Sequence, residues 1–220
     1  MGQLLLSETY MLLLLNAVGD HTDIRLPQYS AGIVLGGIRD LLEAGCITVR
    51  PGGTLEASAP LPDGYSGVTD LFRDLEERTE TAGRWLDLYC CSPSSEKVNA
   101  LLDAMYASLA EKKLIDIEIR RGIFRRKKIV SMRPPAARVV EEFLRDAGNP
   151  RPDSGTAFCI QMLQLAEVLK VYFPRSVKVK LRTVLRVCER EEIWGQMEPY
   201  VNRIRNFNYQ NAVNFGAVYQ

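Results

Sequence analysis

The sequence predicts a mainly α-helical protein: a single helical domain with two short β-hairpins, the second of which is basic and protrudes. Apolar residues recur at helical spacing along most of the 220-residue chain. Twice, at residues 46–57 and 114–130, a helical pattern gives way to two β-rich runs joined by a glycine-containing turn. Hydrophobic residues make up 46% of the chain, which is enough for a substantial core.

The first helix is predicted over residues 4–18, is apolar on most of its surface, and should therefore lie at the centre of the fold. Gly19 and Asp20 end it. Its apolar run is shorter than the roughly 20 residues of a membrane-spanning helix. No basic segment precedes it, as one would in a signal peptide. The five cysteines lack the spacing of a disulfide framework, which favours free thiols and a cytoplasmic location.

The second helix is predicted to start at an N-capping serine, Ser30, and to run to about Glu43. Three glycines in this helix favour close packing against a neighbouring helix over the cradling of a phosphate: Gly32, Gly36 and Gly37. Strands are expected at residues 46–50 and 54–57, with a Pro-Gly-Gly turn between them. The second helix therefore leads into the first hairpin.

The middle of the chain repeats this order of helix and hairpin. A helix is expected at residues 68–80, and a short helix is expected around Trp85. A serine-rich segment then caps a helix over residues 96–113. The two strands of the second hairpin follow directly, on either side of Gly122.

The last third is predicted to be helical. Pro134 and Pro135 stop the second hairpin, and a helix covers residues 136–146. Residues 148–154 resemble a linker and are the weakest internal boundary of one domain that spans residues 1–220. The remaining segments are predicted as a continuous helix at 156–172, helices at 177–187 and 189–205, and a polar, aromatic tail at 206–220.

The second hairpin concentrates positive charge around two apolar residues. Its basic residues are Arg120, Arg121, Arg125, Arg126, Lys127 and Lys128. Ile123 and Phe124 lie at its turn and are candidates for shallow membrane insertion or for contact between copies of the chain. The formal net charge of the chain is only +1, so this basic patch is a local feature. The same density of basic residues also has a simpler interpretation, because solvated edge strands often carry Lys and Arg. A second basic stripe comprises Lys178, Arg182, Arg186 and Arg190.

No residue pattern indicates catalysis. The one histidine, His21, has no metal-ligand partners at suitable spacing. Nucleophile-elbow, P-loop and dinucleotide-binding patterns are absent from the sequence. Acidic pairs such as Glu76-Glu77 are adjacent along helices and so do not face one another. We therefore expect a protein that is not an enzyme, with no catalytic residues, no metal and no cofactor.

Three segments carry a resemblance to a known family. They are the leucine-rich opening at residues 4–15 around Glu8, the small-residue helix and turn at 31–47, and the Arg121–Lys128 hairpin segment with its Gly-Ile-Phe turn. Over about residues 4–146, the chain thus resembles the Golgi phosphoprotein 3 family, including its bacterial members. The resemblance implies a mostly helical domain with a protruding hairpin. From the eukaryotic members it further implies binding of a phosphoinositide headgroup and recruitment of membrane-enzyme tails.

The chain departs from the family at the lipid pocket, which in eukaryotic members uses a Trp and several Arg. Arg25 falls about where the Trp would be, and Val34 falls where the first Arg would be. The later Arg pair falls near Asn99 and Leu102 in one register of the comparison. In the other register it falls near Ser108 and Glu111. The resemblance therefore leaves the identity of the lipid open.

These observations lead to three functional hypotheses. The first is a peripheral membrane adaptor that binds an acidic phospholipid surface through Arg25 and the basic hairpin, with a protein client as a further partner. The second is a winged-helix-like nucleic-acid-binding module, which is disfavoured because the helix before the hairpin presents Glu96, Asn99 and Asp103. The third is an oligomeric scaffold that uses the hairpin as its interface.

Overall fold

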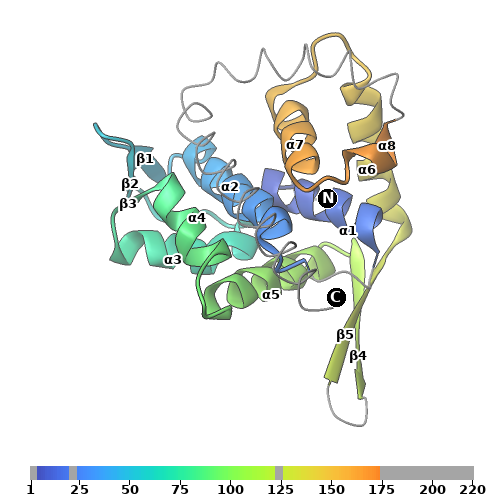
Figure 1. The fold of residues 1–220 in the computed structure, drawn as a ribbon, viewed down its shortest axis with the longest axis horizontal. Coiled ribbons are helices and arrows are strands. Elements are labelled where there is room, and N and C mark those ends of the chain that lie inside the picture. The colour runs from blue at the N-terminus through green and yellow to red at the C-terminus, as the bar shows by residue number, and fades with distance from the viewer. Residues whose placement is uncertain (1–3, 20–23, 122–125, 174–220) are drawn as a thin grey trace, which may run out of the picture.

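The computed structural model describes residues 4–19, 24–121 and 126–173, and helices make up most of this part of the chain (Figure 1). Two small antiparallel sheets accompany the helices, so the predicted mainly α fold with two short hairpins is confirmed. The hydrophobic core joins apolar side chains from Leu5 to Phe173. It includes residues on both sides of the linker-like stretch at 148–154.

Helix α1 (Leu6–Val18) lies at the centre of the helical body, as its composition predicts (Figure 1). Its residues from Tyr10 to Leu14 have no exposed surface. Helices α2 (Pro27–Glu43), α6 (Pro134–Ala147) and α7 (Ser154–Leu165) pack against it. A helix that is covered on several sides needs apolar residues around most of its circumference, which explains the leucine-rich sequence.

Glycines allow α2 to approach α1 closely. A Cβ atom on Gly36 would lie 2.9 Å from the Cα of Ser7, and one on Gly32 would lie 2.4 Å from the ring of Tyr10. Both distances are shorter than two non-bonded carbon atoms can approach each other. The predicted role of these glycines in helix packing is therefore confirmed.

The start of α2 differs from the sequence prediction. The helix begins at Pro27, three residues before the predicted cap at Ser30. Proline suits the first helical turn because its φ angle is already helical and its missing N–H would have no partner there. Ser30 is instead buried inside the helix, where its hydroxyl donates to the carbonyl oxygens of Arg25 and Leu26 at 3.3 Å each.

The first hairpin belongs to a three-stranded sheet with the order β1-β2-β3. The strands β1 (Ile47–Val49) and β2 (Thr54–Ala57) pair as predicted, and β3 (Glu80–Thr81) adds to the other side of β2. A 3₁₀ turn, η1 (Ser66–Val68), leads into helix α3 (Thr69–Glu77). The predicted helix at 68–80 therefore ends too late, because Arg78 is already extended and the chain joins the sheet.

Helices α4 (Ala82–Cys90) and α5 (Glu96–Glu111) follow, and α5 packs against α3, α4 and η1. Beyond α5, Lys113 adopts a φ of 59° and turns the chain into the second hairpin. This hairpin comprises β4 (Ile115–Arg121) and β5 (Arg126–Met132) and extends away from the helical body (Figure 1). The predicted protrusion is thus present in the fold.

Two predictions fail in the last third of the described chain. Pro134 and Pro135 form the first turn of α6 and do not merely precede it. The predicted continuous helix at 156–172 is wrong, because α7 ends at Leu165 and α8 (Leu169–Tyr172) is a separate turn. Glu167 adopts a φ of 59° between them, which redirects the chain so that Leu169 is buried.

Several predictions fall outside the described residues. They concern His21, the turn residues Gly122, Ile123, Phe124 and Arg125, the helices at 177–187 and 189–205, the tail at 206–220, and the basic stripe of Lys178, Arg182, Arg186 and Arg190.

Candidate functional site

The second hairpin is a regular antiparallel ladder of two seven-residue strands. Its register runs from Ile115 opposite Met132 at the base to Arg121 opposite Arg126 at the outer end. Arg120 stands opposite Lys127. Directly opposite residues in such a ladder have Cα atoms about 4.5–5.5 Å apart, so the ladder brings basic residues from both strands together.

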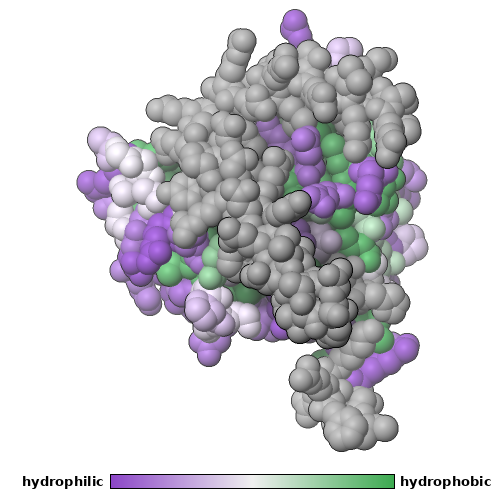
Figure 2. All heavy atoms as spheres, in the orientation of Figure 1, coloured by the Kyte–Doolittle hydropathy of each residue, from purple (hydrophilic) through white to green (hydrophobic). Residues whose placement is uncertain are grey.

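The two faces of the hairpin differ in character because side chains alternate along a strand. One face carries Ile115, Ile117, Val130 and Met132, which pack against the core. Farther out on the same face, Ile119 is 63% exposed. The other face carries exposed charged residues, and hydrophilic side chains mark the outer flank of the described part of the hairpin (Figure 2).

Carboxylates of the same chain pair with two cations of the hairpin, Arg120 and Lys128. Arg120 donates two hydrogen bonds to Glu118, from Nε to Oε1 at 2.9 Å and from Nη2 to Oε2 at 3.1 Å. The hydrogen bond from Arg120 lowers the pKa of Glu118, which keeps this carboxylate charged. Lys128 bonds Asp103 of α5 and lies 5.1 Å from the ring centroid of Tyr106. The sequence could not reveal these partners, because each depends on how the strands and α5 are arranged.

The hairpin is anchored at its base by a buried ionic cluster. Glu8 of α1 has no exposed surface and accepts hydrogen bonds from the Nζ of Lys112 at 2.7 and 2.5 Å. Ser108 also donates to Glu8 at 2.6 Å, and the amide of Leu5 donates at 2.9 Å. Since Lys112 immediately follows α5, this cluster ties the end of α5 to the start of α1. A glutamate inside a leucine-rich helix is the only hint of it in the sequence.

The structure places the predicted site residues in two separate regions. Arg120, Arg121, Arg126, Lys127 and Lys128 share the hairpin ladder. Arg25 is exposed in the turn that leads into α2 and does not belong to the hairpin. Arg125, Ile123 and Phe124 are among the residues that the structure does not describe.

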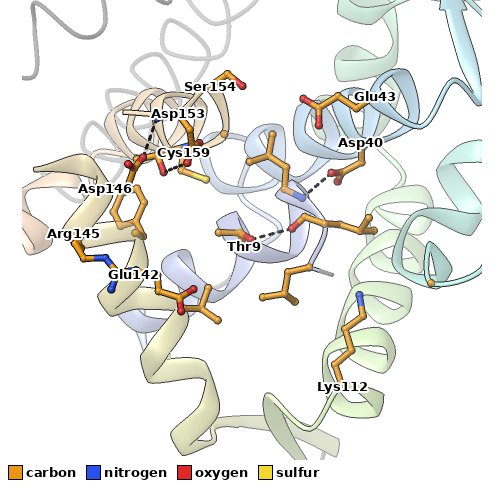
Figure 3. A pocket seen from close by; sticks show the side chains of 18 of the residues that line it. Thr9, Asp40, Glu43, Lys112, Glu142, Arg145, Asp146, Asp153, Ser154 and Cys159 are labelled. Carbon is orange, nitrogen blue, oxygen red and sulfur yellow. Dashed lines mark hydrogen bonds between the residues drawn. The ribbon is translucent and has the colours of Figure 1, made fainter. Parts of the chain in front are cut away.

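A cavity of about 1170 Å³ lies between the start of α1, the end of α2, α6 and the start of α7 (Figure 3). Its acidic side chains are Asp40, Glu43, Asp63, Glu142, Asp146 and Asp153, and Lys112 and Arg145 also line it. Among the described residues, neither Arg25 nor Arg120 nor Lys128 lines this cavity. The cavity is therefore a further region, apart from these predicted site residues.

Several of these carboxylates hold helix ends in place. Asp40 accepts hydrogen bonds from the amides of Leu6 at 2.7 Å and Ser7 at 3.0 Å, and from the hydroxyl of Ser7 at 2.5 Å. Burial raises the pKa of Asp40 to about 6, although these three bonds favour its charged form. Asp153 caps α7 through the amide of Thr156 at 2.7 Å. These contacts satisfy amides at helix starts, which is a structural role.

Burial raises the pKa of the Cys159 thiol, which lines the cavity, and so disfavours its thiolate form. Within residues 4–19, 24–121 and 126–173, no group of three or more His, Cys, Asp or Glu is placed to hold a metal ion. In the same ranges, no helix is long and apolar enough to span a bilayer.

No protein-family model matches the chain, and no curated protein matches its sequence. The resemblance to the Golgi phosphoprotein 3 family therefore stays a prediction.

Proposed function

We propose that this protein is a non-enzymatic peripheral membrane adaptor, resembling Golgi phosphoprotein 3, that binds acidic phospholipid through the second hairpin. The observation that carries the proposal is the register of β4 and β5. It sets Arg120 opposite Lys127 and Arg121 opposite Arg126 on an element that extends from the body, beside an exposed Ile119. A hairpin that extends from the body can contact a flat surface more closely than the helical body can.

The energetics favour an anionic surface as the partner. A Lys or Arg near an anionic membrane contributes about 1 kcal/mol, so several on one hairpin give a substantial affinity. The attraction falls off over a Debye length of about 8 Å at physiological ionic strength, so the cations must approach the surface closely. Ile119 adds an apolar contact at the depth of the headgroups.

The resemblance extends the proposal to a phosphoinositide-like headgroup and to a membrane-protein client. Arg25 and the hairpin cations would both contribute to headgroup binding in that case. Because Arg25 lies on a different element from the hairpin, the proposal rests on charge density and not on one closed pocket. In the cavity, the carboxylates of Asp40 and Asp153 hold helix starts, a structural role that fits a non-enzymatic protein.

Co-sedimentation with lipid vesicles tests the proposal. Vesicles of phosphatidylcholine alone are compared with vesicles that also contain phosphatidylserine or phosphatidylinositol 4-phosphate. We expect binding to the acidic vesicles only, with an affinity that falls as salt increases. The variant with Arg125, Arg126, Lys127 and Lys128 replaced by Ala should lose most of this binding.

A matched control removes the same charge elsewhere. Arg50, Arg73, Arg78 and Arg84 are exposed arginines of the first sheet, α3 and α4, and each pairs with a neighbouring carboxylate. Their replacement by Ala should leave most of the vesicle binding intact. Equal losses in the two variants would show that only net charge matters and would refute the hairpin as the site.

The alternatives give different results in the same experiments. A protein that shifts duplex DNA in a salt-dependent way, yet ignores every acidic vesicle, is a nucleic-acid-binding module. A protein that ignores both, and whose sedimentation coefficient in solution falls when the hairpin is mutated, is an oligomeric scaffold. Either outcome would overturn the membrane proposal.

A further inference from the structure

Carboxylates of the same chain compete with any bound anion for the cations of the hairpin. Glu118 accepts both hydrogen bonds of the Arg120 fork at 2.9 and 3.1 Å. Asp103 pairs with Lys128, and Asp116 lies 3.6 Å from the Nε of Arg133. A phosphate that binds one of these cations must therefore replace a carboxylate that is already in contact.

These carboxylates can be displaced. The side chains of Glu118, Asp103 and Asp116 are 60%, 66% and 69% exposed, so water can solvate each one after it leaves its partner. Ion pairs at such exposure have a small free energy, about 0–1 kcal/mol. The ion pairs are thus weak enough to exchange. Each carboxylate nevertheless competes at a high effective concentration, because it belongs to the same chain as its partner.

The carboxylates occupy the inner part of the hairpin. Asp116 and Glu118 lie on the half of β4 that is nearer the body, and Asp103 reaches the hairpin from α5. Their partners Arg120, Lys128 and Arg133 also lie on the described part of the hairpin or next to it. A phosphate must therefore compete with a carboxylate for each of these three cations.

We propose that Glu118, Asp103 and Asp116 are specificity-determining residues that set a minimum negative charge density for the surface the hairpin binds. The inference rests on the proposed function. On a sparsely charged membrane, Arg120 and Lys128 keep their carboxylate partners and contribute little to binding. On a densely charged membrane, several phosphates compete at once and these two cations exchange partners, so binding rises steeply with the anionic fraction.

The test replaces the carboxylates by their neutral amides. Glu118→Gln and Asp103→Asn are compared with wild type on phosphatidylcholine vesicles that contain increasing fractions of phosphatidylserine. Since one charge near an anionic surface is worth about 1 kcal/mol, each substitution should tighten binding by up to about fivefold at low anionic fraction. The effect should shrink at high fraction, where the wild-type carboxylates are already displaced.

Two control variants separate this effect from net charge. Glu56→Gln removes a glutamate paired with Arg50 on the first hairpin, and Asp70→Asn removes an aspartate paired with Arg73 on α3. Both add the same charge as the test variants but lie on other elements. We expect their binding curves to stay close to that of wild type.

The outcomes for this inference differ from those for the proposed function. If wild type binds acidic vesicles but the hairpin variants behave like the controls, the threshold is refuted and the membrane function stands. If wild type fails to bind and the Glu118→Gln, Asp103→Asn double variant binds, the threshold is supported in its strongest form. If neither protein binds any acidic vesicle, both proposals are overturned.

Discussion

Replacement of Lys112 by Met tests how much the buried ionic cluster between α5 and α1 stabilises the fold. The substitution keeps most of the apolar stem of the side chain and removes its ammonium group. The carboxylate of Glu8, which has no exposed surface, would then keep only the hydroxyl of Ser108 and the amide of Leu5 as donors. The charge of Glu8 would remain buried without a counter-ion.

The expected cost follows from the contact distances. Two unit charges about 2.6 Å apart at an effective dielectric constant of 20 attract each other by about 6 kcal/mol, and the two Nζ contacts of Lys112 measure 2.7 and 2.5 Å. The desolvation of Lys112, which the variant avoids, offsets part of this attraction. We therefore expect Lys112→Met to lower the free energy of unfolding by about 3–5 kcal/mol, as for other broken buried pairs.

Urea unfolding followed by circular dichroism measures this loss. The double variant Glu8→Gln, Lys112→Met should recover at least about 1 kcal/mol, because it no longer buries an unpaired charge. Lys97→Met provides the control, since Lys97 pairs with Asp74 at 45% exposure and should cost about 1 kcal/mol or less. If Lys112→Met lowers the free energy of unfolding no more than the control does, the buried pair of Glu8 and Lys112 does not stabilise the fold as expected.

Three further predictions concern stability. Because burial raises the pKa of Asp40 to about 6, its protonation stabilises the fold fully below about pH 4, and this contribution is lost as pH rises through 6. The free energy of unfolding of wild type relative to Asp40→Asn should thus fall by about 3 kcal/mol between pH 4 and pH 7 in urea titrations; a flat difference would contradict this. Gly36→Ala should lower the free energy of unfolding by about 1–3 kcal/mol, because its Cβ would lie 2.9 Å from the Cα of Ser7, and an unchanged thermal midpoint would contradict this contact. Glu167→Gly should raise the thermal midpoint, because a non-glycine residue at a φ of 59° is strained by about 1–2 kcal/mol; a lowered midpoint would refute this.

The second hairpin shows how much of the candidate site can be predicted from the sequence. The alternation of Ile115, Ile117 and Ile119 predicts a strand, and the glycine turn predicts its partner. The basic residues lie close together in the sequence and can be identified there directly. That Glu118 neutralises Arg120 and that Asp103 reaches Lys128 could not be predicted, because these contacts depend on rotamers and on the angle between the hairpin and α5.

Two boundaries that the sequence misplaced have different causes. Ser30 is a good N-cap by residue type, but Pro27, which also favours a helix start, begins α2 earlier and Ser30 becomes a core residue. The apolar spacing continues through Glu167, yet the chain turns there so that Leu169 reaches the core. At Glu167 the burial of apolar surface outweighs local preferences, which amount to about 1 kcal/mol or less per residue.

The sequence by itself determined the helical class, the central first helix, the close helix packing at glycines and the place of the basic hairpin. Each is encoded in local periodicity, composition or residue size, which short stretches of chain contain in full. Only the tertiary structure decided that Glu8 meets Lys112, that Asp40 caps α1, and that Asp103 reaches Lys128 of the hairpin. Ion pairs and remote caps join residues far apart in sequence, and only the folded geometry brings their charges within reach.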